Sequence, residues 1–195
     1  EEKFLPQVSG ALSISSSRPL VLDTSDISAM EKALRFYPGR ALINSISAEK
    51  SKMVPLLRLA AKYGAMFIAL PVGFKGMPKD FSERKEAIQY LVRNAKKYHL
   101  STSSIVVDGL VMAVSSLPRS AYDTLKAVHW CHTTLRCNTV VGLSNVSFGL
   151  PQRHVLNATF LSMLKKQGLS TVIANPAHLS SSEDRYAKNV LLGND

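Results

Sequence analysis

Four polar residues stand where short apolar runs end, and their types suit recognition of a planar ligand. Asp23, Asn44, Asp108 and Asn145 each follow a run of apolar residues typical of a buried parallel strand. In parallel α/β folds the carboxyl ends of the strands meet on one face, where ligands bind. We therefore expect two carboxylates and two carboxamides to converge there. A carboxylate accepts two parallel hydrogen bonds from an amino group and an adjacent ring N–H, and a pterin offers that edge.

Other interpretations of such residues stay open. A single Asp or Asn at this position is often a helix cap or a loop hydrogen bond. Metal binding by the two Asp residues lacks a third hard ligand at a matching strand end, so we predict no metal site. Four potential zinc ligands also surround Trp130, but their spacing divides them over different helix faces, which favours ordinary packing. These are His129, Cys131, His132 and Cys137.

Six strand, loop and helix units must position the polar residues. The expected strands cover residues 20–22, 41–43, 65–70, 105–107, 140–141 and 171–174. Strict alternation with amphipathic helices predicts a parallel sheet with right-handed crossovers. The most informative unit runs from Val140 to Asn157, in which the small polar loop Gly142 to Gly149 precedes a helix opened by Pro151. The spacing suits an open doubly wound sheet or most of an eight-unit barrel.

Composition indicates an ordinary globular protein. The chain has 195 residues, of which 46% are hydrophobic and 19% charged, and this predicts a single domain over residues 1–195. No run of about 18 apolar residues occurs, and the acidic start EEKFLPQVSG lacks the basic region of a signal peptide. Two cysteines are too few for a disulfide framework. We expect a cytoplasmic protein that does not associate with membranes.

The net charge of +10 comes from Lys and Arg, including Arg84, that we expect on helix surfaces scattered along the chain. A solvated basic surface is the favoured interpretation, and a face for an acidic protein or a polyanionic ligand comes second. No basic patch interleaved with aromatic residues accompanies the charge, so we expect no nucleic-acid partner.

Four segments together resemble the pterin-binding methyltransferase family. They are LVLDTSD (20–26), ALINSIS (41–47), IVVDGLVM (105–112) and VVGLSNVSFGLPQRHVLNATFL (140–161). The last segment is the most specific. This family includes the methyltetrahydrofolate:corrinoid/iron-sulfur protein methyltransferases and the folate-binding domain of cobalamin-dependent methionine synthase. Dihydropteroate synthase is a related but less similar enzyme with the same barrel fold.

The resemblance implies a fold and a site. The fold would be a (β/α)8 TIM barrel of the dihydropteroate synthase-like type, with six strand-helix units visible in this chain and the site at its C-terminal rim. Asp23, Asn44 and Asp108 would hold the pyrimidine edge of the pterin. Gly142 and Ser144 would shape the floor, Asn145 would hydrogen-bond the ring nitrogen that carries the methyl group, and Arg153 would lie near that nitrogen.

The resemblance also implies an activity in one-carbon metabolism. The chain would be a methyltransferase that moves the methyl group of methyltetrahydrofolate to the Co(I) of a corrinoid, or cobalamin, held by a partner protein. A tertiary amine is a poor leaving group, so a polar network around Asn145 that favours the protonated nitrogen would assist the transfer. The alternative is a non-catalytic pterin-binding or scaffold module. Members of the family often form homodimers, which we also expect as a possibility here.

The chain departs from the family pattern at two places. Gly109 follows Asp108 where the family usually has proline, and we expect a looser loop there. The two strands that open the family's barrel do not appear before Leu20. We therefore expect the N-terminal part of the barrel to be missing from this chain. A fragment of a longer protein is the favoured explanation. Two alternatives stay open: another copy or chain supplies the missing part, or the chain is a diverged protein with an open barrel that binds folate weakly or not at all.

Overall fold

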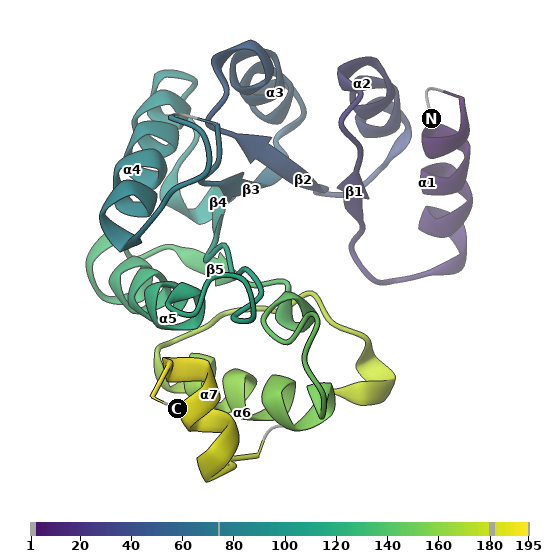
Figure 1. The fold of residues 1–195 in the computed structure, drawn as a ribbon. Coiled ribbons are helices and arrows are strands. Elements are labelled where there is room, and N and C mark those ends of the chain that lie inside the picture. Colours follow the sequence, from purple (N-terminus) through teal and green to yellow (C-terminus); the bar gives the residue numbers. More distant parts are fainter. Residues whose placement is uncertain (1–2, 74, 180–181, 195) are drawn as a thin grey trace. The chain divides into compact units, whose positions relative to one another are not determined.

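Strands and helices alternate along the chain in the computed structural model, which describes residues 3–73, 75–179 and 182–194 (Figure 1). The chain divides into two compact units. Unit 1 comprises Glu1–Met77 and Glu86–Val106, and unit 2 comprises Pro78–Lys85 and Val107–Asp195. Along the chain, α4 (Phe81–Lys97) and β4 (Ile105–Asp108) each begin in one unit and end in the other. The single domain over residues 1–195 stays a prediction.

Unit 1 is built on parallel strands that follow one another in chain order. β1 (Val21–Asp23) pairs with β2 (Leu42–Ser47), β2 pairs with β3 (Met66–Leu70), and the first residues of β4 come next. The register places Asp23 beside Asn44. β2 is longer than its apolar run predicts, because its pairing with β3 resumes at Ile46 after a register shift. Asn44 therefore lies inside the strand and not after it.

Three helices of unit 1 pack in succession, as Figure 1 shows. They are α1 (Phe4–Ser15), α2 (Ile27–Phe36) and α3 (Lys50–Tyr63). Asp26 caps α2, since its Oδ1 accepts the N–H groups of Ser28 and Ala29 at 2.8 and 3.2 Å. Apolar side chains from helices and strands form the core, among them the fully buried Met30, Ile43, Met53 and Phe67.

Unit 2 contains β5 (Asn138–Val140) and three helices that pack on one another. They are α5 (Ser120–Trp130), extended by the π-helical turn η2 (Cys131–Leu135), α6 (Arg153–Lys166) and α7 (Arg185–Leu192). Their core includes Val128, Val141, Phe160, Leu164 and Leu191. Three short 3-10 helices complete the described structure: η1 (Thr102–Ser104), η3 (Leu143–Asn145) and η4 (Pro176–His178).

The sixth expected strand, at residues 171–174, is reduced to an isolated parallel bridge between Gly142 and Ile173. Its backbone still runs along β5, because the N–H groups of Thr171 and Ile173 donate to the carbonyls of Thr139 and Val141, both at 3.0 Å. The pairing ends before Pro176, which has no N–H to continue a ladder. The segment thus occupies the position of a strand without its length. Among the described helices, none combines the length and apolar character needed to cross a membrane.

Candidate functional site

The structure brings together two of the predicted site residues in unit 1. Asn44 Nδ2 donates a hydrogen bond of 3.1 Å to Asp23 Oδ2. The register of the parallel strands explains this contact, because it places the two residues side by side. Asp23 is exposed and Asn44 is half-buried. The pair therefore offers a carboxylate and a carboxamide to a ligand.

Asp108 ends β4 and lies in a more enclosed setting in unit 2. Its Oδ1 accepts the N–H of Leu110 at 2.8 Å. Burial raises the pKa of Asp108, while the Leu110 N–H and the positive charge of Arg84 oppose that rise. Leu110 has a φ of 55°, in the left-handed region. Such a conformation costs a non-glycine residue about 1–2 kcal/mol, so the contacts around the loop must fix it.

Gly109 is held at both of its backbone polar groups. Its N–H donates to the carbonyl of Val140 at 2.9 Å, and its own carbonyl accepts from Arg84 Nη1 at 3.0 Å. A Cβ at this position would lie 3.0 Å from a methyl of Thr124 and 3.1 Å from a methyl of Val141. The expectation of a looser loop at Gly109 is therefore wrong. Proline in its place could not form the bond to Val140, because proline has no N–H.

The Asn145 side chain lies over Gly142. A Cβ on Gly142 would come within 3.1 Å of Asn145 Nδ2, so the glycine leaves room for the carboxamide. The backbone N–H of Asn145 also donates to the Gly142 carbonyl at 3.2 Å, within the turn η3. Asn145 and Ser144 are exposed, and no described residue hydrogen-bonds to the carboxamide of Asn145. Its donor and acceptor are thus available to a ligand.

Arg153 holds the loop that carries Asn145. Its Nη2 donates to the Ser144 carbonyl at 2.8 Å, and its Nε donates to Ser147 Oγ at 3.1 Å. Ser147 in turn donates to Asn157 Oδ1 at 2.8 Å and is fully buried. The contacts seen for Arg153 are therefore with the loop itself, and its contact with a pterin stays a prediction.

Comparison with protein families decides what kind of chain this is. The model of a family described as "Pterin binding enzyme" matches residues 1–175. The chain belongs to that family. The resemblance seen in the sequence motifs is thereby confirmed.

Two similar proteins are a methylcorrinoid:tetrahydrofolate methyltransferase of Eubacterium limosum and a methionine synthase of Mycobacterium leprae. The first is 28% identical over 182 residues, which are 91% of this chain and 66% of that protein. The second is 26% identical over 187 residues, which are 88% of this chain and 15% of that protein. The chain thus spans slightly less than two thirds of the first relative and a small part of the second.

Solved structures of dihydropteroate synthase are similar in fold. A Yersinia pestis dihydropteroate synthase with a pterine-sulfa conjugate has a TM-score of 0.69 at 17% identity, covering 88% of this chain and 68% of that one. The 7,8-dihydropteroate synthase of Vibrio fischeri has a TM-score of 0.61 at 15% identity, covering 88% and 67%. These neighbours are TIM barrels, and they confirm the predicted fold class for this pterin-binding family member.

Sequence reasoning missed the largest fully buried polar side chain among the described residues. Arg84 was expected on a helix surface, and that expectation is wrong, because its side chain is 0% exposed. A signal was present in the sequence. Arg84 precedes the apolar residues Ala87, Ile88 and Leu91 by three, four and seven positions, which is the spacing of one helix face.

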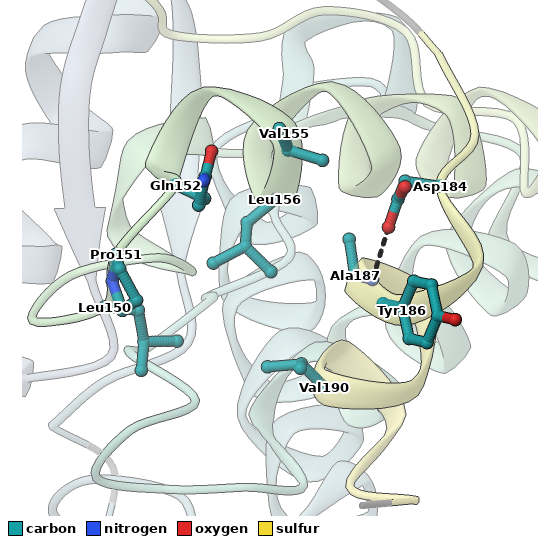
Figure 2. A pocket seen from close by; sticks show the side chains of 9 residues that line it. All are labelled: Leu150, Pro151, Gln152, Val155, Leu156, Asp184, Tyr186, Ala187 and Val190. Carbon is teal, nitrogen blue, oxygen red and sulfur yellow. Dashed lines mark hydrogen bonds between the residues drawn. The ribbon is translucent and has the colours of Figure 1, made fainter.

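A cavity of about 550 Å³ lies between the start of α6 and α7 in unit 2. Figure 2 shows Val155 and Leu156 of α6 on one side and Ala187 and Val190 of α7 on the other. Asp184 also lines it, but its carboxylate is already engaged by the N–H of Ala187 at 2.8 Å. The described lining is mostly apolar and includes none of the predicted site residues, so we assign this cavity no part in pterin binding.

The residues around Trp130 pack as ordinary side chains. Cys131 is fully buried, Cys137 is nearly so, and the Cys137 N–H donates to the Cys131 carbonyl at 3.2 Å. Trp130 stacks edge-on against Phe81 at 6.5 Å between ring centroids. Within the part of the chain that the structure describes, no group of three or more His, Cys, Asp or Glu could hold a metal ion.

Proposed function

We propose that the chain binds methyltetrahydrofolate and transfers its methyl group to the Co(I) of a corrinoid carried by another protein. The observation that carries this proposal is the exposed carboxamide of Asn145 over Gly142, in a chain of the pterin-binding family. The names of two relatives, which pair a methylcorrinoid with tetrahydrofolate or describe a methionine synthase, support a methyl-transfer reaction in preference to other pterin chemistry.

Two carboxylates and a carboxamide would bind the pyrimidine edge of the pterin. Asp108 would accept the pair of parallel hydrogen bonds from the amino group and the ring N–H, since the ionised form of a carboxylate has two acceptor oxygens. Asp23 and Asn44 would supply further polar contacts, and their mutual hydrogen bond fixes which oxygen of Asp23 remains free. Gly142 and Ser144 would border the ring.

Asn145 would act on the nitrogen that carries the methyl group. As the bond from methyl carbon to nitrogen breaks, the nitrogen gains electron density and must take a proton to leave as a neutral amine. Asn145 cannot supply this proton, because a carboxamide is not an acid at ordinary pH. It would instead accept a hydrogen bond from the protonated nitrogen, which is stronger in the transition state than in the ground state. The proton would come from solvent.

The acceptor of the methyl group would be the Co(I) nucleophile of a corrinoid, which is a substrate on a partner protein. The name of the Eubacterium relative describes methyl transfer in the opposite direction, from a methylcorrinoid to tetrahydrofolate. The same residues serve both directions, because forward and reverse reactions pass through one transition state. A homodimer, a cytoplasmic location and the absence of nucleic-acid and membrane partners stay predictions.

The test combines calorimetric titration with methyltetrahydrofolate and a transfer assay with reduced cobalamin as the acceptor. Asn145→Ala is expected to bind the pterin within about tenfold of the wild type and to transfer the methyl group roughly 100- to 1,000-fold more slowly, the usual loss when one group that stabilises a developing charge is removed. Asn138→Ala is the matched control, because Asn138 is an exposed residue of the same type at the opposite end of β5.

Two outcomes would contradict this proposal. A well-folded wild-type chain that binds no methyltetrahydrofolate would remove the pterin site. Binding without any transfer to reduced cobalamin would favour the alternative, a non-catalytic pterin-binding or scaffold module.

A further inference from the structure

The guanidinium of Arg84 is a buried positive charge in unit 2. Arg84 lies in the first turn of α4, and it is the largest side chain of the fully buried set, with 0% exposure. Arginine is almost never fully buried unless its charge and its N–H groups are used by the structure. The surroundings of Arg84 therefore indicate what it does.

The first contact of Arg84 fixes the loop that follows Asp108. Its Nη1 donates to the carbonyl of Gly109 at 3.0 Å and to Thr124 Oγ1 at 2.9 Å. Thr124 is fully buried and donates its own hydroxyl to the Ser120 carbonyl at 2.8 Å, so it anchors the arginine to α5. The residue directly after Asp108 is thus bonded to Arg84 of α4, which Thr124 of α5 also holds.

The second contribution of Arg84 is its charge. Three carboxylates act on the guanidinium, with Asp123 the strongest, then Asp108 and Asp80. Burial lowers the pKa of Arg84 and these carboxylates oppose that change. Among the described residues no carboxylate forms a direct ion pair with Arg84, and its Nε and Nη2 have no hydrogen-bond partner there. The charge therefore acts on Asp108 through space, without a bond that would occupy the carboxylate.

We propose that Arg84 is a positioning residue for Asp108. It fixes the backbone that carries the carboxylate, and its positive charge favours the ionised form, which is the form able to accept two hydrogen bonds from a pterin edge. This inference rests on the proposed function. It explains why a carboxylate that is partly withdrawn from water can remain a good acceptor. Apart from the hydrogen bond that Oδ1 accepts from the Leu110 N–H, the two carboxylate oxygens stay available for that edge.

The test uses two variants and a control. Arg84→Met keeps an unbranched apolar side chain in place of the arginine stem and removes the guanidinium with its charge, and Arg84→Lys keeps the charge with a different geometry. Lys85→Met is the matched control, because it also removes one positive charge from α4. The Lys85 Nζ atom lies over the Trp130 ring, 5.4 Å from the ring centroid. Each protein is titrated with methyltetrahydrofolate over a range of pH, and the Asp108 carboxyl carbon is followed by NMR, assigned with Asp108→Asn.

In Arg84→Met, Asp108 is expected to titrate at higher pH than in the wild type, because an opposing positive charge is gone. The affinity of Arg84→Met for methyltetrahydrofolate is expected to fall about tenfold or more near neutral pH. This loss is expected to grow as the pH is lowered. Arg84→Lys is expected to restore the Asp108 titration and part of the affinity. Lys85→Met is expected to match the wild type in both measurements.

An unchanged Asp108 titration in folded Arg84→Met would overturn the inference, and so would an affinity loss that is equal at every pH, since that pattern belongs to packing alone. If Arg84→Met does not fold, Thr124→Val replaces it. Thr124→Val removes one acceptor of Nη1 and leaves the charge, so it must lower the affinity without moving the Asp108 titration. Absence of pterin binding by the wild type would contradict the proposed function. The NMR titration of Asp108 is measured without ligand, so it tests the effect of Arg84 on Asp108 independently of pterin binding.

Discussion

Asp23 in unit 1 and Asp108 in unit 2 both end a parallel strand, but they are held in different ways. Asp23 is exposed, and its described partner is another side chain, Asn44, at 3.1 Å. Asp108 is half-buried and is held by a backbone N–H, with the buried Arg84 behind its loop. One carboxylate is arranged by the sheet register, and the other is arranged by a network of buried polar groups.

The difference concerns how much each carboxylate must reorganise to bind a ligand. A hydrogen bond between exposed side chains contributes little, because water replaces it at small cost. A carboxylate fixed by backbone and by a buried charge is already oriented, so less of the binding energy is lost in ordering it. We therefore expect the two aspartates to contribute unequally to one function, although they end similar strands.

Alanine substitution of each aspartate tests this difference. Asp108→Ala is expected to lower the affinity for methyltetrahydrofolate about 100-fold, because two charge-assisted hydrogen bonds are lost. Asp23→Ala is expected to lower it about tenfold. Calorimetric titration of both variants at neutral pH measures the ratio. Circular dichroism and thermal unfolding confirm that each variant is folded. Equal losses in the two variants would remove the distinction between the two carboxylates.

A second effect tests whether the buried polar groups of unit 2 support its loops. Ser147 is fully buried, and its hydroxyl accepts from Arg153 and donates to Asn157. Ser147→Ala is expected to lower the free energy of unfolding by about 1–2 kcal/mol, since it removes the buried hydroxyl that joins Arg153 to the half-buried Asn157. Ser144→Ala is the matched control at about 0.5 kcal/mol or less, because the bond from Arg153 goes to its backbone carbonyl. Urea denaturation compares them, and an unaffected Ser147→Ala would show that the network adds no stability.

The residues at the strand ends could be predicted from the sequence because strand and site share one pattern. An apolar run followed by Asp or Asn predicted a strand end, and Asp23 and Asp108 are the last residues of β1 and β4. Asn145 lies in the turn η3, after β5 has ended, and the part of all three residues in ligand binding stays a prediction. Asn44 was identified by the same pattern, although β2 continues to Ser47. The strand continues because its pairing with β3 resumes after a register shift, which depends on a residue far along the chain.

What the sequence could not predict depends on contacts between distant segments. Arg84 reads as a surface residue from its type, and only its phase on α4 relative to Ile88 and Leu91 indicates otherwise. Its bond to Gly109 joins residues 25 positions apart, and its bond to Thr124 joins residues 40 positions apart. Gly109 likewise appeared to loosen its loop, whereas the structure holds it through a strand neighbour and a buried arginine.

A third prediction separates stability from function at Asp108. Burial raises the pKa of this carboxyl above its ordinary 3.8, so the folded chain binds the proton more tightly than the unfolded chain does. The stability associated with that proton is present below the ordinary pKa and is lost as the pH rises through the raised value. Asp108→Asn cannot titrate, and it is therefore expected to be more stable than the wild type at neutral pH.

The advantage of Asp108→Asn is expected to shrink as the pH approaches the ordinary value of about 4. Urea denaturation of both proteins between mildly acidic and neutral pH measures this change. A variant that gains stability while it loses pterin affinity would mark Asp108 as a residue kept for binding at a cost to folding. A constant difference at every pH would mean that the carboxyl does not titrate differently on folding.

The smallest effect is expected in unit 1. Asn44→Ala removes the hydrogen bond to Asp23, and we expect the free energy of unfolding to change by about 0.5 kcal/mol or less, because Asp23 is exposed and water can take the place of the lost donor. The affinity for methyltetrahydrofolate is nevertheless expected to fall several-fold, up to about tenfold, since Asp23 would lose its fixed orientation. Urea denaturation and calorimetry on the same sample separate the two effects. A large loss of stability in Asn44→Ala would show that the pair in unit 1 is also part of the folding core, and the contrast with the buried network around Asp108 would then disappear.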